Sequence, residues 1–145
     1  MTNLVAELFT AQEALADRPA LVAQYDLPTE VVIWGWIGLA RVILNNCGLL
    51  YRPDPAGKPC LITPVKLGDP MAATADVIKF GEIVDLVAWH PRRSNRWALR
   101  TGEGIVLGHA ELGTNQKILP NPYVWVMAGG DGLCVLQPLY LAHAA

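Results

Sequence analysis

The sequence has few charges, few cysteines and no apolar run long enough to span a membrane. Charged residues make up 17% of the 145 residues and hydrophobic residues 52%, against about 25% charged in an average globular domain. This composition excludes intrinsic disorder, and a net charge of -2 is unusual for a nucleic-acid-binding domain. We expect a single globular domain over residues 1–145. Because surplus apolar side chains must be covered, we expect a homodimer more readily than a monomer.

The three cysteines, Cys47, Cys60 and Cys134, are widely spaced and include no C-x-x-C pair. They fit neither a disulfide framework nor a structural zinc site, so we expect reduced thiols in a cytoplasmic protein. The first residues have neither the basic start nor the apolar core of a secretory signal. The most apolar segment, 31–44, is shorter than the ~20 residues that span a bilayer and contains Arg41. We interpret this segment as a buried strand and expect no membrane association.

The hydrophobic patterns predict an α+β fold built on a mostly antiparallel, twisted sheet of about five to six short strands. Apolar residues at helical spacing predict an N-terminal amphipathic helix over 3–16. Runs rich in β-branched and apolar residues then predict a three-stranded meander, in which the strand that contains Pro64 lies at an edge. Its strands are expected over 31–44, 49–52 and 60–66.

The second half of the chain is expected to contain a hairpin and short helices. Residues 67–81 are interpreted as a loop, and 83–90, which fits helix or strand, as a strand that pairs with 96–101. Two glycines after residue 128 predict the end of a helix. The remaining elements are short helices around 105–111 and 123–128 and a last strand over 133–137.

The predicted hairpin gives Asp85 an unusual environment. Strand alternation places it on one face with apolar neighbours, namely Ile83, Val87 and Trp89. A half-buried carboxylate there needs a partner. We expect Arg96 or Arg100, across the hairpin, to supply it.

Positive charge is concentrated in one stretch of the chain. Four of the eleven Lys and Arg residues fall between Arg92 and Arg100, and no carboxylate lies between Asp85 and Glu103. A guanidinium group presents a rigid fork of donors that matches a phosphate or a carboxylate, and neighbouring tryptophans can stack on bases. The alternative is a solvated hairpin tip with no ligand. The candidate ligand-binding residues are His90, Arg92, Arg93, Arg96, Trp97 and Arg100.

Signals for catalysis are weak. Asp85, His90 and Cys60 are the candidates for a small hydrolase or transferase site, if the fold brings them together. An H-x-E sequence at 109–111 matches half of the zinc deaminase signature, but the P-C-x-x-C half is missing. The glycines over 102–108 lack the spacing and context of a dinucleotide-binding turn. We therefore expect no cofactor and no metal ion.

The stretch from Asp85 to Thr101 resembles small bacterial or prophage proteins of no assigned function, a resemblance that implies no residue roles. Because no motif fixes a reaction, we interpret the chain as a non-enzymatic binding domain. It would use either an apolar interface with a protein partner or the basic hairpin. Binding of nucleic acid or of a phosphorylated or other anionic ligand through Arg92 to Arg100 is the alternative within binding, and the small hydrolase or transferase is the alternative outside it.

Overall fold

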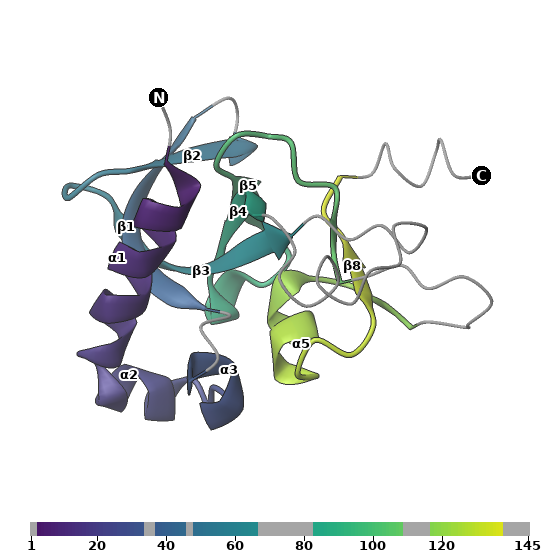
Figure 1. Ribbon diagram of the computed structural model, residues 1–145, viewed down its shortest axis with the longest axis horizontal. Coiled ribbons are helices and arrows are strands. Elements are labelled where there is room, and N and C mark those ends of the chain that lie inside the picture. Colours follow the sequence, from purple (N-terminus) through teal and green to yellow (C-terminus); the bar gives the residue numbers. More distant parts are fainter. Residues whose placement is uncertain (1–2, 34–36, 46–47, 67–82, 109–116, 138–145) are drawn as a thin grey trace.

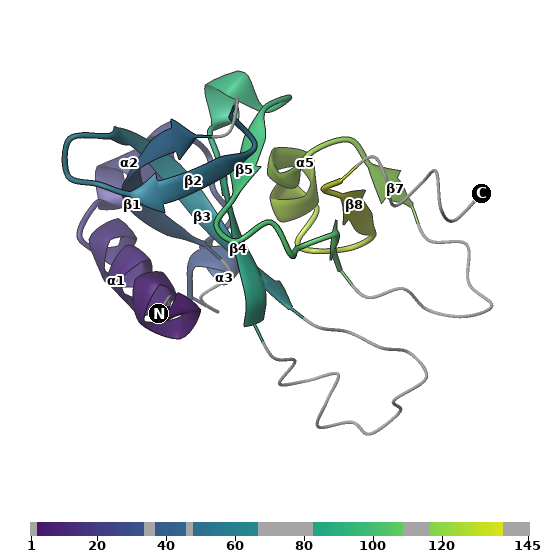
Figure 2. The ribbon, with the colours of Figure 1, turned by 90° about the horizontal axis from the view of Figure 1, so that it is seen from above.

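The computed structural model describes residues 3–33, 37–45, 48–66, 83–108 and 117–137, and these form helices and two β-sheets. The main sheet is a closed, five-stranded barrel, and the other sheet has three short strands. Figures 1 and 2 show α1 and α2 on one side of the barrel and α5 and β8 on the other. The predicted α+β class, with a mostly antiparallel main sheet, is confirmed. No helix among these residues is long and apolar enough to cross a membrane.

Three helices precede the barrel. The predicted amphipathic helix is confirmed as α1 (Leu4–Ala16), whose first turn is capped by Asn3: its side-chain oxygen accepts a hydrogen bond from the Ala6 amide at 3.0 Å. The buried face of α1 carries Leu8, Ala11 and Leu15 at helical spacing. Two shorter helices follow, α2 (Pro19–Gln24) and α3 (Thr29–Ile33).

The prediction of a single strand over 31–44 was wrong in its first part. Residues Thr29–Ile33 form α3, and β1 (Gly38–Asn45) begins only later. Pro28 fixes a backbone angle that suits a helix start, and its carbonyl accepts a hydrogen bond from the Val31 amide at 3.1 Å. Val31 is buried as predicted, but from a helix.

The five barrel strands are joined in the order β1-β2-β5-β4-β3. They are β1, β2 (Leu50–Pro53), β3 (Lys58–Lys66), β4 (Ile83–Trp89) and β5 (Trp97–Leu99). All strand pairings in the barrel are antiparallel except that between β2 and β5, where Leu50 pairs in parallel with Leu99. The Leu99 amide donates to the Leu49 carbonyl at 3.0 Å. Closure removes the free edges that an open sheet would expose.

The strand that contains Pro64 is not at an edge, which corrects the predicted meander. β3 lies between β1 and β4 and pairs with both. It pairs with β1 only over 58–62 and with β4 only over 61–66, so Pro59 and Pro64 each lie where β3 has a single neighbour. Each proline is thereby accommodated, because a missing N–H group is tolerated where no second strand needs it.

Two hydrophobic clusters lie on opposite faces of β3 and β4, as strand alternation requires. The predicted strand over 83–90 is confirmed, and Asp85 shares a face with Val87 and Trp89. Ile83 does not share it: the register between β3 and β4 shifts at Val65 and Lys66, and Ile83 packs on the α1 side with the other cluster. A β-bulge of this kind reverses the alternation beyond it.

The C-terminal part forms the three-stranded sheet, in the order β6-β8-β7, and one helix. The helix predicted around 105–111 was wrong over the described residues 105–108, because β6 (Val106–Leu107) is a strand that pairs with β8. The predicted last strand is confirmed as β8 (Leu133–Val135). The predicted helix near 123–128 is confirmed as α5 (Pro122–Met127), and both glycines after it have positive φ angles. β7 (Ile118–Leu119) completes the sheet. The predicted loop over 67–81 and the H-x-E sequence lie outside the described residues.

Candidate functional site

The basic turn, residues 90–96, connects β4 to β5. His90 organises it: its Nδ1 atom accepts a hydrogen bond from the Arg92 amide at 3.1 Å, and its carbonyl accepts one from the Arg93 amide at 3.0 Å. These bonds form a single turn of 3-10 helix, Pro91–Arg93. The turn continues because the Arg96 amide donates to the Arg93 carbonyl at 3.0 Å. The backbone of the basic turn is therefore fixed without help from the arginine side chains.

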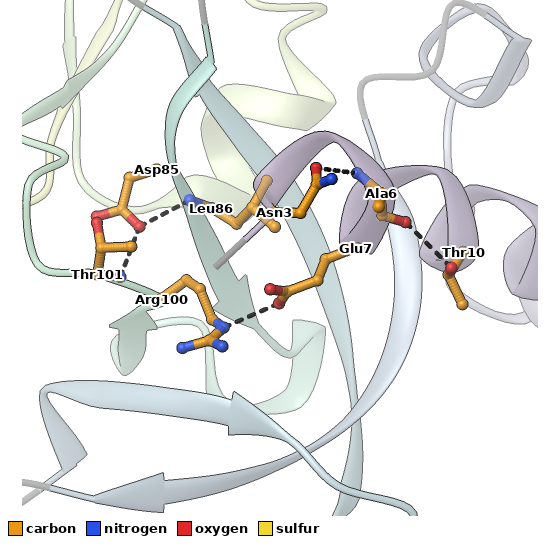
Figure 3. A network of polar contacts seen from close by, with 8 residues as sticks. All are labelled: Asn3, Ala6, Glu7, Thr10, Asp85, Leu86, Arg100 and Thr101. Carbon is orange, nitrogen blue, oxygen red and sulfur yellow. Dashed lines mark hydrogen bonds and ion pairs between the residues drawn. The ribbon is translucent and has the colours of Figure 1, made fainter. Parts of the chain in front are cut away.

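The arginine cluster predicted from the sequence divides into two parts. Arg92, Arg93 and Arg96 are exposed and form no ion pair with any described residue. Arg100 instead donates from Nε to the Glu7 carboxylate of α1 at 2.8 Å, and both side chains are largely buried (Figure 3). The first three arginines are free to bind an external anion, whereas Arg100 joins α1 to the barrel.

Trp97 is directed into the protein. Its indole N–H donates to the Leu136 carbonyl at 3.0 Å, and its ring packs against the larger core cluster. It pairs across the hairpin with Trp89, whose indole N–H donates to the Thr63 hydroxyl at 2.9 Å. Trp97 is partly buried, and its indole hydrogen bond and its packing against the core account for its position without a stacking role.

His90 also contacts the end of α2. Its Nε2 atom and the Tyr25 hydroxyl are 3.2 Å apart, and the two rings meet edge to face, with centroids 5.4 Å apart. Because Nδ1 accepts from the Arg92 amide, the hydrogen of the neutral ring lies on Nε2 and is donated to Tyr25. Burial, together with the positive charges of Arg92 and Arg93, lowers the pKa of His90 and favours this neutral form.

A pocket of about 400 Å³ adjoins this pair. It lies between the α1–α2 junction and strands β1 and β3, and its volume falls in the usual range for small-molecule sites, about 300–1,000 Å³. The lining combines an apolar wall with ionisable groups. Its apolar residues are Ala14, Leu21, Leu39, Ala40, Pro59 and Leu61, and its polar ones Asp17, Arg18, Tyr25, Arg41, Cys60 and His90.

The pocket brings together two of the three predicted catalytic residues. Leu61 of β3 pairs with Trp89 of β4, so Cys60 lies opposite His90, the residue that follows β4. Burial raises the pKa of the Cys60 thiol, and the positive charge of Arg93 only partly opposes this effect. Cys60 therefore stays a thiol near neutral pH, which is the unreactive form.

Asp85 does not belong to the pocket. It precedes His90 by five residues of extended chain, about 16 Å at ~3.3 Å per residue. Its Oδ1 atom accepts hydrogen bonds from the amides of Leu86 and Thr101, and Oδ2 from that of Gly104, each at 2.8 Å. Figure 3 shows two of these bonds. The arginine partner predicted for Asp85 is thus replaced by backbone amides, and Asp85, His90 and Cys60 do not assemble into one site.

Four of the six polar residues that line the pocket were not among the predicted site residues: Asp17, Arg18, Tyr25 and Arg41. The first three lie at the ends of α1 and α2, where charged and polar residues are common without any function. Arg41 lies on β1, and its Nη1 atom donates to the Gly57 carbonyl at 3.0 Å. Only the folded chain shows that these residues face the end of β3 and the basic turn.

Comparisons with known proteins identify no relative: no protein-family model, no curated protein and no solved structure matches this chain. Within the described ranges there is also no group of three or more His, Cys, Asp or Glu residues placed to hold a metal ion. The function must therefore be argued from the chemistry of the pocket and the basic turn.

Proposed function

We propose that this protein is a binding domain for a small anionic ligand, which enters the pocket with its phosphate or carboxylate group held by the basic turn. One observation carries the proposal: His90 both lines the pocket and caps the 3-10 turn that presents Arg92 and Arg93. The electrostatic effect of Arg93 on Cys60 supports a position of this arginine close to the pocket.

The charges around the pocket favour an anion. Arg18 and Arg41 line it, and Arg92 and Arg93 follow His90 at its edge. Arg41 uses Nη1 on the Gly57 carbonyl, which leaves its other guanidinium donors for a ligand. Arginines bind carboxylate and phosphate through paired, charge-assisted hydrogen bonds, so a few of them suffice for a small ligand.

A small ligand agrees better with this surface than a nucleic acid does. Single-stranded nucleic acids are held by exposed aromatic rings as well as by positive charge. Within the described part of the chain the one exposed aromatic side chain is Phe9, which lies on α1 and not beside the basic turn. The net charge of -2 is a second argument against a nucleic-acid-binding domain.

Calorimetric titration with three probes tests the proposal: pyrophosphate, 4-methylpentanoate and a single-stranded oligothymidylate. We expect one of the two small anions to bind, and the Arg92→Ala/Arg93→Ala variant to weaken its binding about tenfold or more. The matched control, Arg52→Ala/Lys66→Ala, removes two exposed positive charges elsewhere on the barrel and should bind like the parent protein.

Three results would overturn the proposal. The first is that neither small anion binds at concentrations of about 10 mM, and the second is binding that both double variants weaken equally. The third is an oligothymidylate that binds more tightly than either small anion, with strong salt dependence, which would assign the basic turn to nucleic acid. Because the backbone of the turn is held by His90, the double variant should keep the thermal stability of the parent protein.

A further inference from the structure

The pocket contains one group that a site for a simple anion should not have. Asp17 lines it next to Arg18, and its carboxylate forms no ion pair with any described residue. A negative charge in this position repels an anion that approaches the arginines. The Asp17 carboxylate favours binding only if the ligand also carries a positively charged group, which it would attract.

The position of Asp17 in α1 is a second observation. Asp17 is the C-cap of this helix, and the last turn of α1 contains no basic residue. The C-terminal end of a helix carries a partial negative charge, so an acidic side chain there is unfavourable and a cation is favoured. Asp17 is exposed and forms no ion pair among the described residues, so water solvates its carboxylate in the free protein, and both this carboxylate and the helix end would favour a bound cation.

The aliphatic residues of the lining provide a third region that a ligand would contact. They are Ala14, Leu21, Leu39, Ala40 and Leu61, and they line the pocket together with the charged groups. A ligand that contacts all three regions has an anionic group, a cationic group and an aliphatic part. A pocket of about 400 Å³ lies near the lower end of the usual range for small-molecule sites, about 300–1,000 Å³, and so suits a small molecule of this kind.

Building on the proposed function, we infer that the ligand is a zwitterion of the amino-acid type with an aliphatic side chain. Its ammonium group lies at Asp17 and the C-terminal end of α1. Its carboxylate is held by arginines at the pocket, among which Arg92 and Arg93 are supplied by the basic turn. The aliphatic part packs against Leu21 and the β1–β3 wall.

Three ligands with the same branched aliphatic part test this inference: L-leucine, 4-methylpentanoate, which lacks the ammonium group, and 3-methylbutylamine, which lacks the carboxyl group. Titration calorimetry should show that leucine binds about tenfold more tightly than 4-methylpentanoate and that the amine binds most weakly. In the Asp17→Asn variant leucine should lose this advantage, while 4-methylpentanoate binds as well as before or better. The control, Glu13→Gln, removes an exposed carboxylate one turn earlier in α1, outside the pocket lining, and should leave both affinities unchanged.

The outcomes separate this inference from the proposed function. If leucine and 4-methylpentanoate bind equally well and Asp17→Asn changes neither, the zwitterion is refuted, although binding that depends on Arg92 and Arg93 would still support an anion site. The same holds if pyrophosphate alone binds. If none of the small anions and neither leucine nor the amine binds to the parent protein, both proposals fail.

Discussion

Replacing Asp85 by alanine should destabilise this fold more than any loss of a surface charge. Asp85 is completely buried, and its carboxylate accepts the amides of Leu86, Thr101 and Gly104. It thereby fixes the chain that leaves β5. The same segment is held from the C-terminal side by Gln137, whose side-chain amide donates to the carbonyls of Gly102 and Gly104.

The magnitude follows from the three hydrogen bonds. A hydrogen bond to a charged group contributes about 1.5–3 kcal/mol, and a buried donor left without a partner costs about 1–3 kcal/mol. Thr101 is exposed, so its amide can form a hydrogen bond to water in the variant, and the total loss is smaller than three times the value for one bond. We expect Asp85→Ala to lower the free energy of unfolding by about 3–5 kcal/mol, a large part of the ~5–15 kcal/mol of a typical domain. Asp85→Asn keeps one acceptor but turns an NH₂ group towards the Gly104 amide, and should cost about 2 kcal/mol.

Urea unfolding followed by tryptophan fluorescence measures these changes, because Trp89 and Trp125 are buried. Hydrogen exchange at the Gly104 amide provides a local readout, and its protection should be lost in Asp85→Ala. The control is Asp131→Ala, which removes an exposed carboxylate and should change the free energy by less than about 0.5 kcal/mol. An Asp85→Ala protein within about 1 kcal/mol of the parent would refute the reasoning, because the amides would then have found other partners.

Two further predictions concern the packing of α1 and the protonation of His90. A Cβ atom at Gly38 would lie 2.6 Å from the Ala11 backbone, so Gly38→Ala should lower the free energy of unfolding by about 1–3 kcal/mol or more. An unchanged midpoint of urea unfolding would contradict this prediction, because α1 would then be able to move away from β1 at no cost. Burial and the neighbouring arginines lower the pKa of His90, so the unfolded chain takes up this proton at higher pH than the folded chain, and stability should fall as the pH drops below about 6.5. His90→Asn, which keeps an acceptor for the Arg92 amide, should reduce the loss of unfolding free energy between about pH 7.5 and 5.5, and parallel curves for the two proteins would contradict this assignment.

The features that were predicted correctly from the sequence are those whose signal is local. The N-terminal helix, the stop at Gly129 and the pairing of β4 with β5 follow from residues close together in the chain. The same holds for the basic turn, which is one compact stretch between two strands. The α+β class follows from these elements. A cytoplasmic location and a homodimer stay predictions.

Only the tertiary structure decided which polar groups meet. Arg100 pairs with Glu7 across 93 residues, and His90 with Tyr25 across 65. Asp85 was expected to need an arginine, but the antiparallel register of β4 and β5 brings the chain after β5 beside its carboxylate, and backbone amides satisfy it. Nearly every residue has a backbone amide, so the sequence does not indicate which amides will bind the Asp85 carboxylate.

The pocket also depends on contacts between distant segments, which could not be predicted from the sequence. Its residues come from the α1–α2 junction, from β1 and β3, and from the residue after β4. Each of them looks ordinary in its own segment, and the unpaired Asp17 looks like any acidic residue at the end of a helix. Local side-chain pattern therefore determined the helices, strands and turns of this protein. The packing of α1 and α2 against a closed barrel, which depends on contacts between distant segments, determined where the pocket lies.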